Sequence, residues 1–277
     1  MKRKTYSPYG IISTRLKKIK LALKNSLLDE ELLADLESCI SMSDGAEKYT
    51  EQNTTAESIN LKYVSEYTSN HDWSKAYDKK KSSGFLGSQM LCGHVSGQFL
   101  KMLVKIVKAK NILEIGMFSG YSALAMAESL PANGKIIACE NNQYAIDIAN
   151  KLFKKFGEKR IYVKKGSAIV SLNDLYKGES TFDFVFIDAT KSQYPQYLNL
   201  LIKNKLIKKH TLICIDNTFL QGKVFSTHET QNTSSRVMRK FNSDLVKNPN
   251  FHTVMLPLRD GFTLLRQNDY AEAKKKY

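Results

Sequence analysis

Between residues 111 and 217 the chain alternates short apolar runs with segments of helical length, and this alternation limits the fold more than any other feature. The runs are apolar throughout rather than at every second residue, which is typical of strands buried on both faces. Strands separated by helices favour a parallel sheet that is covered on both sides. The five candidate strands are residues 111–117, 135–140, 161–165, 182–188 and 211–217.

The end of the chain carries a hairpin signal, because Asp260-Gly261 separates two apolar runs at 252–258 and 262–266. We therefore expect an α/β fold: a Rossmann-like, doubly wound, mostly parallel seven-stranded sheet with a C-terminal antiparallel hairpin. Residues 1–85 are predicted to form an N-terminal helical extension or lid, since seven leucines between 21 and 36 recur at helical spacing. Residues 86–277 form the second predicted domain, and the polar stretch 46–57 is interpreted as a linker.

The net charge is +15, and such an excess can indicate a nucleic-acid partner. Only seven of the 42 basic residues are Arg, the side chain that binds phosphate in a bidentate manner. No aromatic-interleaved RNA motif accompanies the charge. We therefore favour a solvated, Lys-rich surface over a nucleic-acid interface.

The sequence also bears on the compartment. No apolar run approaches the roughly 18 residues of a membrane span, and the basic start of the chain leads into polar sequence without a secretory signal. Four scattered cysteines without CxxC spacing indicate reduced thiols. We expect a cytoplasmic protein that does not bind membranes.

The ends of the first two predicted strands suit a nucleoside ligand, because ligands of such sheets bind at the carboxyl ends of strands. Gly116 and Gly120 follow the first strand and allow a tight turn against a ligand, although their spacing is not the GxGxxG of dinucleotide sites. Glu140 ends the second strand, where an acid can bind both ribose hydroxyls. A plain turn and a solvated acid stay open as alternative interpretations.

Two later strands both finish on oxygen ligands. Asp188 ends the fourth strand, and Asp216 and Asn217 end the fifth. Two carboxylates and an amide oxygen suit a hard divalent cation. Lys191 follows Asp188 by three residues and is a candidate general base if the cation or burial lowers its pKa. Capping acids beside a surface lysine are the alternative.

Several segments together resemble one enzyme family. LEIGMFSGYSALAMAESLP, FDFVFIDATKSQYPQY, LICIDNTFLQGKV, MLCGHVSGQFLKML and LPLRDGFTLLR are similar to segments of the cation-dependent, S-adenosylmethionine-using O-methyltransferases of the catechol and caffeoyl-CoA type. The resemblance covers about residues 85–267. DWSK, GHVSGQ and DNTFLQG further resemble a cyanobacterial branch that methylates demethyl-4-deoxygadusol in mycosporine biosynthesis.

The resemblance implies methyl transfer to one hydroxyl of a catechol, a caffeoyl-type phenol or an enediol such as demethyl-4-deoxygadusol. It implies Lys191 as the base and a homodimeric enzyme. Asp188, Asp216 and Asn217 would hold Mg²⁺, with Mn²⁺ or Ca²⁺ as alternatives. The Thr- and Ser-rich insert at 221–235 differs from the plant members, and we expect it to cap the acceptor pocket. The implied S-adenosylmethionine site comprises Met90, Cys92, Glu114, Gly116, Ser122, Glu140, Ala168, Asp188 and Tyr197. An RNA methyltransferase that uses the basic surface is the alternative function.

Overall fold

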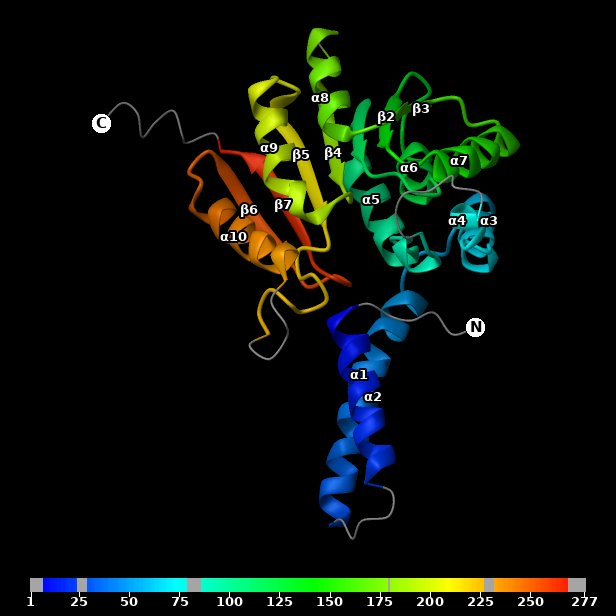
Figure 1. The fold of residues 1–277 in the computed structure, drawn as a ribbon, viewed down its shortest axis with the longest axis vertical. Coiled ribbons are helices and arrows are strands. Elements are labelled where there is room, and N and C mark those ends of the chain that lie inside the picture. The colour runs from blue at the N-terminus through cyan, green and yellow to red at the C-terminus, as the bar shows by residue number, and fades with distance from the viewer. Residues whose placement is uncertain (1–6, 24–28, 79–85, 179, 227–231, 269–277) are drawn as a thin grey trace.

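The computed structural model describes residues 7–23, 29–78, 86–178, 180–226 and 232–268. Its centre is a seven-stranded sheet in the order β3-β2-β1-β4-β5-β7-β6 (Figure 1). The first five strands are parallel, whereas β7 runs antiparallel to both β5 and β6. The predicted fold class is therefore confirmed. The strands are β1 (Asn111–Ile115), β2 (Lys135–Glu140), β3 (Ile161–Lys165), β4 (Phe182–Ile187), β5 (Ile207–Asp216), β6 (Phe251–Leu256) and β7 (Phe262–Gln267).

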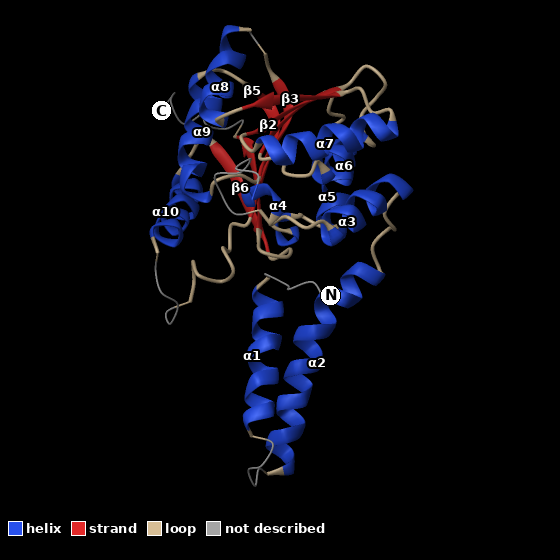
Figure 2. Ribbon diagram, turned by 45° about the vertical axis from the view of Figure 1, so that its right-hand side comes forward, coloured by secondary structure: helices blue, strands red, loops and turns tan. Residues whose placement is uncertain are grey.

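Helices cover both faces of the sheet (Figure 2). One layer contains α5 (His94–Ile106), α6 (Tyr121–Ala127) and α7 (Gln143–Phe156), and the other contains α8 (Ala168–Lys177), α9 (Tyr194–Lys203) and α10 (Thr233–Lys247). Successive side chains of a strand point to opposite faces. Ile112 accordingly packs in the first layer and Leu113 in the second, which explains why the strands are apolar throughout.

The N-terminal part forms two structures rather than one. Helices α1 (Pro8–Ala22) and α2 (Glu30–Gln52) make a hairpin that stands away from the sheet, whereas α3 (Ile59–Asn70) and α4 (Lys75–Asp78) lie against the body (Figures 1 and 2). Ion pairs of Lys17 with Asp44 and of Lys20 with Glu37 join the two hairpin helices.

The interpretation of residues 46–57 as a linker was wrong for its first part, because α2 continues to Gln52. The segment Ala46-Glu47-Lys48 contains good helix formers, so a polar composition is compatible with a solvated helix there. The helix ends at the C-cap residue Asn53. The connection to α3 is therefore shorter than the composition suggested.

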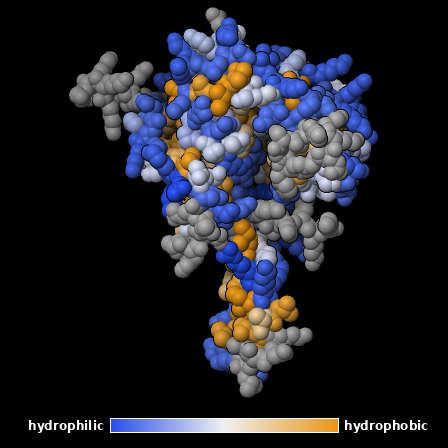
Figure 3. Space-filling model, viewed as in Figure 1, coloured by the Kyte–Doolittle hydropathy of each residue, from blue (hydrophilic) through white to orange (hydrophobic). Residues whose placement is uncertain are grey.

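The surface differs between the two parts of the molecule. Over the body it is mostly hydrophilic, while apolar side chains gather along the α1–α2 hairpin (Figure 3). Among the described residues, no helix combines the length and the apolarity needed to cross a bilayer. All four cysteines lie in the described part of the chain, and none is in a disulfide.

Candidate active site

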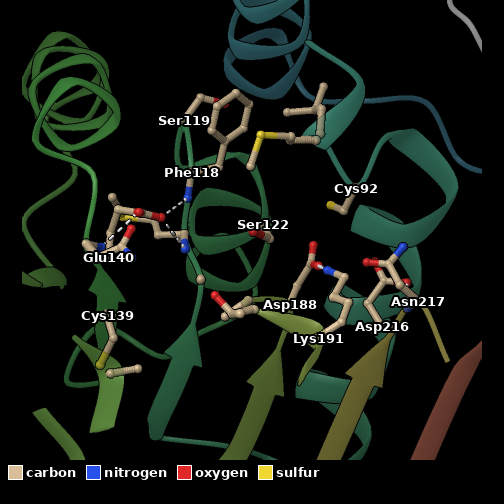
Figure 4. Close-up of a pocket in the computed structure, with 18 of the residues that line it drawn as sticks. Cys92, Phe118, Ser119, Ser122, Cys139, Glu140, Asp188, Lys191, Asp216 and Asn217 are labelled. Carbon is tan, nitrogen blue, oxygen red and sulfur yellow. Dashed lines mark hydrogen bonds and ion pairs between the residues drawn. The ribbon is translucent and has the colours of Figure 1, made fainter. Parts of the chain in front are cut away.

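A cavity of about 600 Å³ opens at the carboxyl ends of β1, β2, β4 and β5 (Figure 4). Strand β1 pairs with β2 on one side and with β4 on the other, so the chain connections diverge at this point of the sheet. Ligands of doubly wound sheets bind in the crevice that such a divergence creates. The cavity is thus where the fold itself predicts a ligand.

On one side of the cavity, Glu140 holds the loop that follows β1. Its Oε2 accepts hydrogen bonds from the backbone N–H groups of Met117, at 3.2 Å, and Phe118, at 2.8 Å. Its Oε1 accepts from Asn141 and Asn142, both at 2.9 Å. Four donors fill the roughly four acceptor positions of a carboxylate. A ribose hydroxyl bound here would share these oxygens with the backbone.

Gly116 allows this loop to lie close to β4. It has a φ of +95°, and a Cβ at this position would lie 2.2 Å from the backbone oxygen of Asp188. Only glycine adopts this conformation without strain, and only glycine leaves room for the approach. Gly116 therefore allows the loop after β1 to contact the backbone at the end of β4.

Glu114 is buried beneath the loop with 0% of its surface exposed. Neither of its carboxylate oxygens has a hydrogen-bond partner among the described residues. Burial raises the pKa of Glu114 to about 8, the charges of Asp188 and Glu140 add to the shift, and the Ser122 hydroxyl opposes it. An unpaired buried carboxylate is costly, so this position favours a positively charged partner.

On the other side of the cavity, Lys191 donates from Nζ to Oδ1 of Asp188 at 2.6 Å. Burial disfavours the charged form of Lys191, but the carboxylate of Asp188 outweighs it and raises the pKa of the lysine above its ordinary value. Lys191 is therefore protonated at neutral pH in this arrangement. It can accept a proton only after the charge of Asp188 has been offset.

Asp216 and Asn217 follow directly on β5. The Asp216 side chain is 4% exposed, and its Oδ1 accepts a hydrogen bond from the Asn217 backbone at 2.6 Å. Burial raises the pKa of Asp216, and the nearby charge of Asp188 raises it further. A cation held beside Asp216 and Asp188 would offset this repulsion.

The donor set itself also fits a divalent cation. Asp188, Asp216 and Asn217 all line the cavity, and they offer carboxylate and amide oxygens, the ligands of hard cations (Figure 4). No group of three His, Cys, Asp or Glu side chains suited to a metal occurs in the part of the chain that the structure describes. The amide of Asn217 would have to complete the set.

The structure brings nearly all the predicted site residues to this one cavity. Met90 and Cys92 reach it from the segment before α5, Ala168 from the start of α8, and Tyr197 from α9. Glu114 is the exception, since it lies buried behind the lining. The predicted residues that line the cavity are Met90, Cys92, Gly116, Ser122, Glu140, Ala168, Asp188, Lys191, Tyr197, Asp216 and Asn217.

Sequence reasoning missed other lining residues, among them Ser7, Gln89, Arg259 and Asp260. Asp260 was interpreted only as part of a hairpin turn. Ser7 caps α1, where its hydroxyl accepts from the Gly10 backbone at 3.1 Å. The turn motif could have pointed to Asp260. Strand β7 pairs with β5, and the turn before β7 therefore lies next to the end of β5 that carries Asp216. No local signal marked Ser7.

The predicted cap at residues 221–235 is described only in part, since residues 227–231 lie outside the described segments. Gln221 forms a turn next to Asp260, and its backbone N–H donates to that carboxylate at 2.5 Å. Asn232 caps α10.

Comparisons with known proteins agree on one family. A family model described as O-methyltransferase matches residues 56–268. Caffeoyl-CoA O-methyltransferase 2 of Populus trichocarpa is 35% identical over 216 residues, which are 75% of this chain and 81% of that protein. The SAH-bound methyltransferase PaMTH1 of Podospora anserina superimposes with a TM-score of 0.70 at 26% identity, covering 83% of this chain and 96% of that one. The O-methyltransferase of Bacillus cereus in complex with SAH gives a TM-score of 0.65 at 25% identity, with coverages of 81% and 97%.

Proposed function

Because this chain belongs to the O-methyltransferase family, whose members use S-adenosylmethionine, we propose that it methylates one hydroxyl of a small acceptor with two vicinal oxygens, with the help of a divalent cation. The caffeoyl-CoA relatives suggest a phenolic acceptor. An enediol such as demethyl-4-deoxygadusol offers the same pair of oxygens. Catechols, caffeoyl-type phenols and this enediol are therefore the acceptors to test.

The observation that carries the proposal is the division of one cavity into two acidic ends. Glu140 lies at one end, and Asp188, Asp216 and Asn217 lie at the other, while Glu114 is buried behind the lining. The first end suits S-adenosylmethionine, since its ribose hydroxyls match Glu140. Its ammonium group would favour the ionised form of Glu114. The second end suits the acceptor oxygens.

Asp188, Asp216 and Asn217 would hold the cation, with Mg²⁺ as the first candidate and Mn²⁺ or Ca²⁺ as alternatives. Such a cation would lower the pKa of an acceptor hydroxyl and fix its orientation. It would also offset the charge of Asp188, which now keeps Lys191 protonated. This supports Lys191 as a base that becomes available only in the loaded site.

The remaining work of the protein is alignment, because the sulfonium methyl of S-adenosylmethionine is already activated. The acceptor oxygen forms the new bond to the methyl carbon, and the sulfur keeps the electron pair of the bond that breaks. Once the cation offsets the charge of Asp188, Lys191 would release its extra proton to solvent, and the neutral Nζ would then accept the hydroxyl proton. Tyr197, whose hydroxyl donates to Oε1 of Gln193 at 2.6 Å, lines the cavity beside this reaction.

A methyl-transfer assay followed by mass spectrometry tests the proposal. S-adenosylmethionine is supplied with each acceptor in turn, with Mg²⁺ or with EDTA. We expect a singly methylated product that disappears with EDTA, and we expect Asp216→Ala to lose turnover while it still binds S-adenosylmethionine. Activity of that variant in EDTA contradicts the cation role. Cofactor binding without any small-molecule product points instead to an RNA acceptor.

The proposed assembly is a homodimer formed through the α1–α2 hairpin. Helix α1 carries four basic and no acidic residues, and α2 carries seven acidic residues and one basic residue. Both helices also expose large apolar side chains, which are Tyr9, Ile12, Ile19, Leu21, Leu32, Met42 and Tyr49. A second hairpin packed antiparallel would bring basic α1 over acidic α2 and cover these side chains. The four free thiols suit a reducing compartment such as the cytoplasm.

A further inference from the structure

The turn between β6 and β7 holds an acid to which no role has been assigned so far. Asp260 is 7% exposed and lines the cavity. Its Oδ1 accepts the backbone N–H of Gln221 at 2.5 Å, and its Oδ2 accepts from Nδ2 of Asn217 at 3.3 Å. Both carboxylate oxygens therefore act on the segment that follows β5.

These contacts dictate how the Asn217 side chain is turned. An ionised carboxylate only accepts hydrogen bonds, so Asn217 must present its NH₂ group to Asp260. The amide oxygen then points away from Asp260, and Asn217 lines the cavity next to Asp216 (Figure 4). A carboxylamide that is free to rotate would offer nitrogen to the cavity as readily as oxygen.

The backbone around Asn217 is held by the same turn. Asn217 has a φ of 59°, a left-handed conformation that residues other than glycine adopt uncommonly. The N–H of Thr218 donates to the Gly261 carbonyl at 3.1 Å, and the N–H of Phe219 donates to the Asp260 carbonyl at 2.8 Å. The turn and the segment after β5 are thus joined through backbone as well as side-chain hydrogen bonds.

We propose that Asp260 is a positioning residue that turns the amide oxygen of Asn217 into the cavity as a cation ligand. The inference rests on the cation site of the proposed function. A partner that orients a ligand through a hydrogen bond changes metal affinity by about 10- to 100-fold when it is lost. This role differs from that of a turn residue, because it requires the carboxylate of Asp260 to accept from Asn217 and Gln221.

An exchange of the two residues tests this without relying on activity. In Asp260→Asn, the new amide must keep its oxygen toward the Gln221 N–H, so its NH₂ group faces Asn217. Asn217 then turns its oxygen to this NH₂ group and its own nitrogen to the cavity. In the double variant Asn217→Asp/Asp260→Asn, the carboxylate at 217 accepts from the amide at 260 and keeps a second oxygen for the cation.

The probe is Mn²⁺ alone, and its affinity is measured from the free-ion electron paramagnetic resonance signal. We expect Asp260→Asn to weaken Mn²⁺ binding about 10-fold or more. When Asp260→Asn is added to the Asn217→Asp variant, the Mn²⁺ affinity should stay equal to that of the single variant Asn217→Asp or rise above it. The matched control is Asp183→Asn, because Asp183 likewise accepts two hydrogen bonds, both from the backbone N–H groups of Lys110 and Asn111, but at the far end of the sheet. Mn²⁺ affinity should not change in the control.

The outcomes separate the inference from the function it rests on. Equal losses from Asp260→Asn in both backgrounds would mean that Asp260 supports only the fold of the segment, which overturns the inference while the cation site stands. An unchanged affinity in Asp260→Asn also overturns it. Failure of the unaltered protein to bind Mn²⁺, with S-adenosylmethionine binding intact, overturns both the cation site and the inference.

Discussion

The two glutamates of the cavity are held in opposite ways. Glu140 accepts four backbone hydrogen bonds, whereas the oxygens of Glu114 accept none from the described residues. Glu114 is also fully buried, so its charged form is disfavoured until a cationic group arrives. The protonation of Glu114 should therefore contribute to the stability of the protein without cofactor.

We expect Glu114→Gln to stabilise the cofactor-free protein at high pH. The pKa of Glu114 in the folded state is about 8, above its ordinary value of 4.5, so folding stability falls as pH rises between these values. At pH 9 the variant should melt at least ~2 °C higher than the unaltered protein, equivalent to about 1 kcal/mol. At pH 5 the difference should be small. An equal difference at both pH values contradicts the assignment, and the variant should gain less from added S-adenosylmethionine.

We expect Lys191→Met to lower kcat by about 10²- to 10⁴-fold, the usual contribution of a general base. The affinity for S-adenosylmethionine should stay within a few-fold, because Lys191 lies at the acceptor end of the cavity. Steady-state kinetics and cofactor titration measure the two effects. Lys208→Met is the matched control, since Lys208 pairs with Asp183 away from the cavity. A similar kcat in both variants would remove Lys191 from the reaction.

At the scale of elements, the segment that joins α3 to α4 packs against the loop after β1. Trp73 is 6% exposed, its indole N–H donates to the Thr68 carbonyl at 2.9 Å, and its ring lies 4.6 Å from that of Phe118. Phe118 in turn donates its backbone N–H to Glu140. Trp73 thus connects the N-terminal helices to Glu140, for which we propose contact with the ribose.

We expect Trp73→Ala to destabilise the protein by about 3–5 kcal/mol, as is usual for a large buried aromatic side chain. Trp73→Phe keeps a ring against Phe118 and should fold, so it serves for the binding measurement. Its affinity for S-adenosylmethionine should fall while KM for the acceptor stays the same. The opposite pattern would make Trp73 part of an acceptor lid.

The limits of elements show which of them could be predicted. Strands 135–140 and 161–165 agree with β2 and β3 because their apolar runs have clear ends. Strand β5 starts at Ile207, four residues before the prediction, since Lys208, Lys209 and His210 interrupt the apolar pattern. Pairing of Phe182 with Ile207 extends the strand there. A neighbouring strand, rather than the composition of the segment, decides this boundary.

At the scale of the whole molecule, the α1–α2 hairpin is the feature that a monomer does not explain. It stands away from the body (Figures 1 and 2) and exposes apolar side chains on both helices (Figure 3). Ser7 at its start nevertheless lines the cavity. Association through the hairpin would therefore connect assembly to the site.

We expect the protein to be a dimer in solution and the double variant Ile12→Glu/Met42→Glu to be a monomer. Ile12 and Met42 are 47% and 65% exposed, so the new charges fit the monomer but not a packed interface. A stable interface of this kind buries about 800 Å² on each partner. Light scattering after size-exclusion chromatography measures the mass. Val246→Glu on α10, at 74% exposure, is the control. A dimer that survives the double change forms through another surface.

The sequence by itself determined the sheet, its connections and the strand ends that carry Glu140, Asp188, Asp216 and Lys191. These follow from local periodicity and from the rule that parallel strands finish at one edge. Only the tertiary structure decided that Asp260 meets Asn217, 43 residues away in the chain, and that Ser7 reaches the cavity. It also decided the protonation of Glu114 and Lys191, because burial and neighbouring charges set a pKa and neither is written in local sequence.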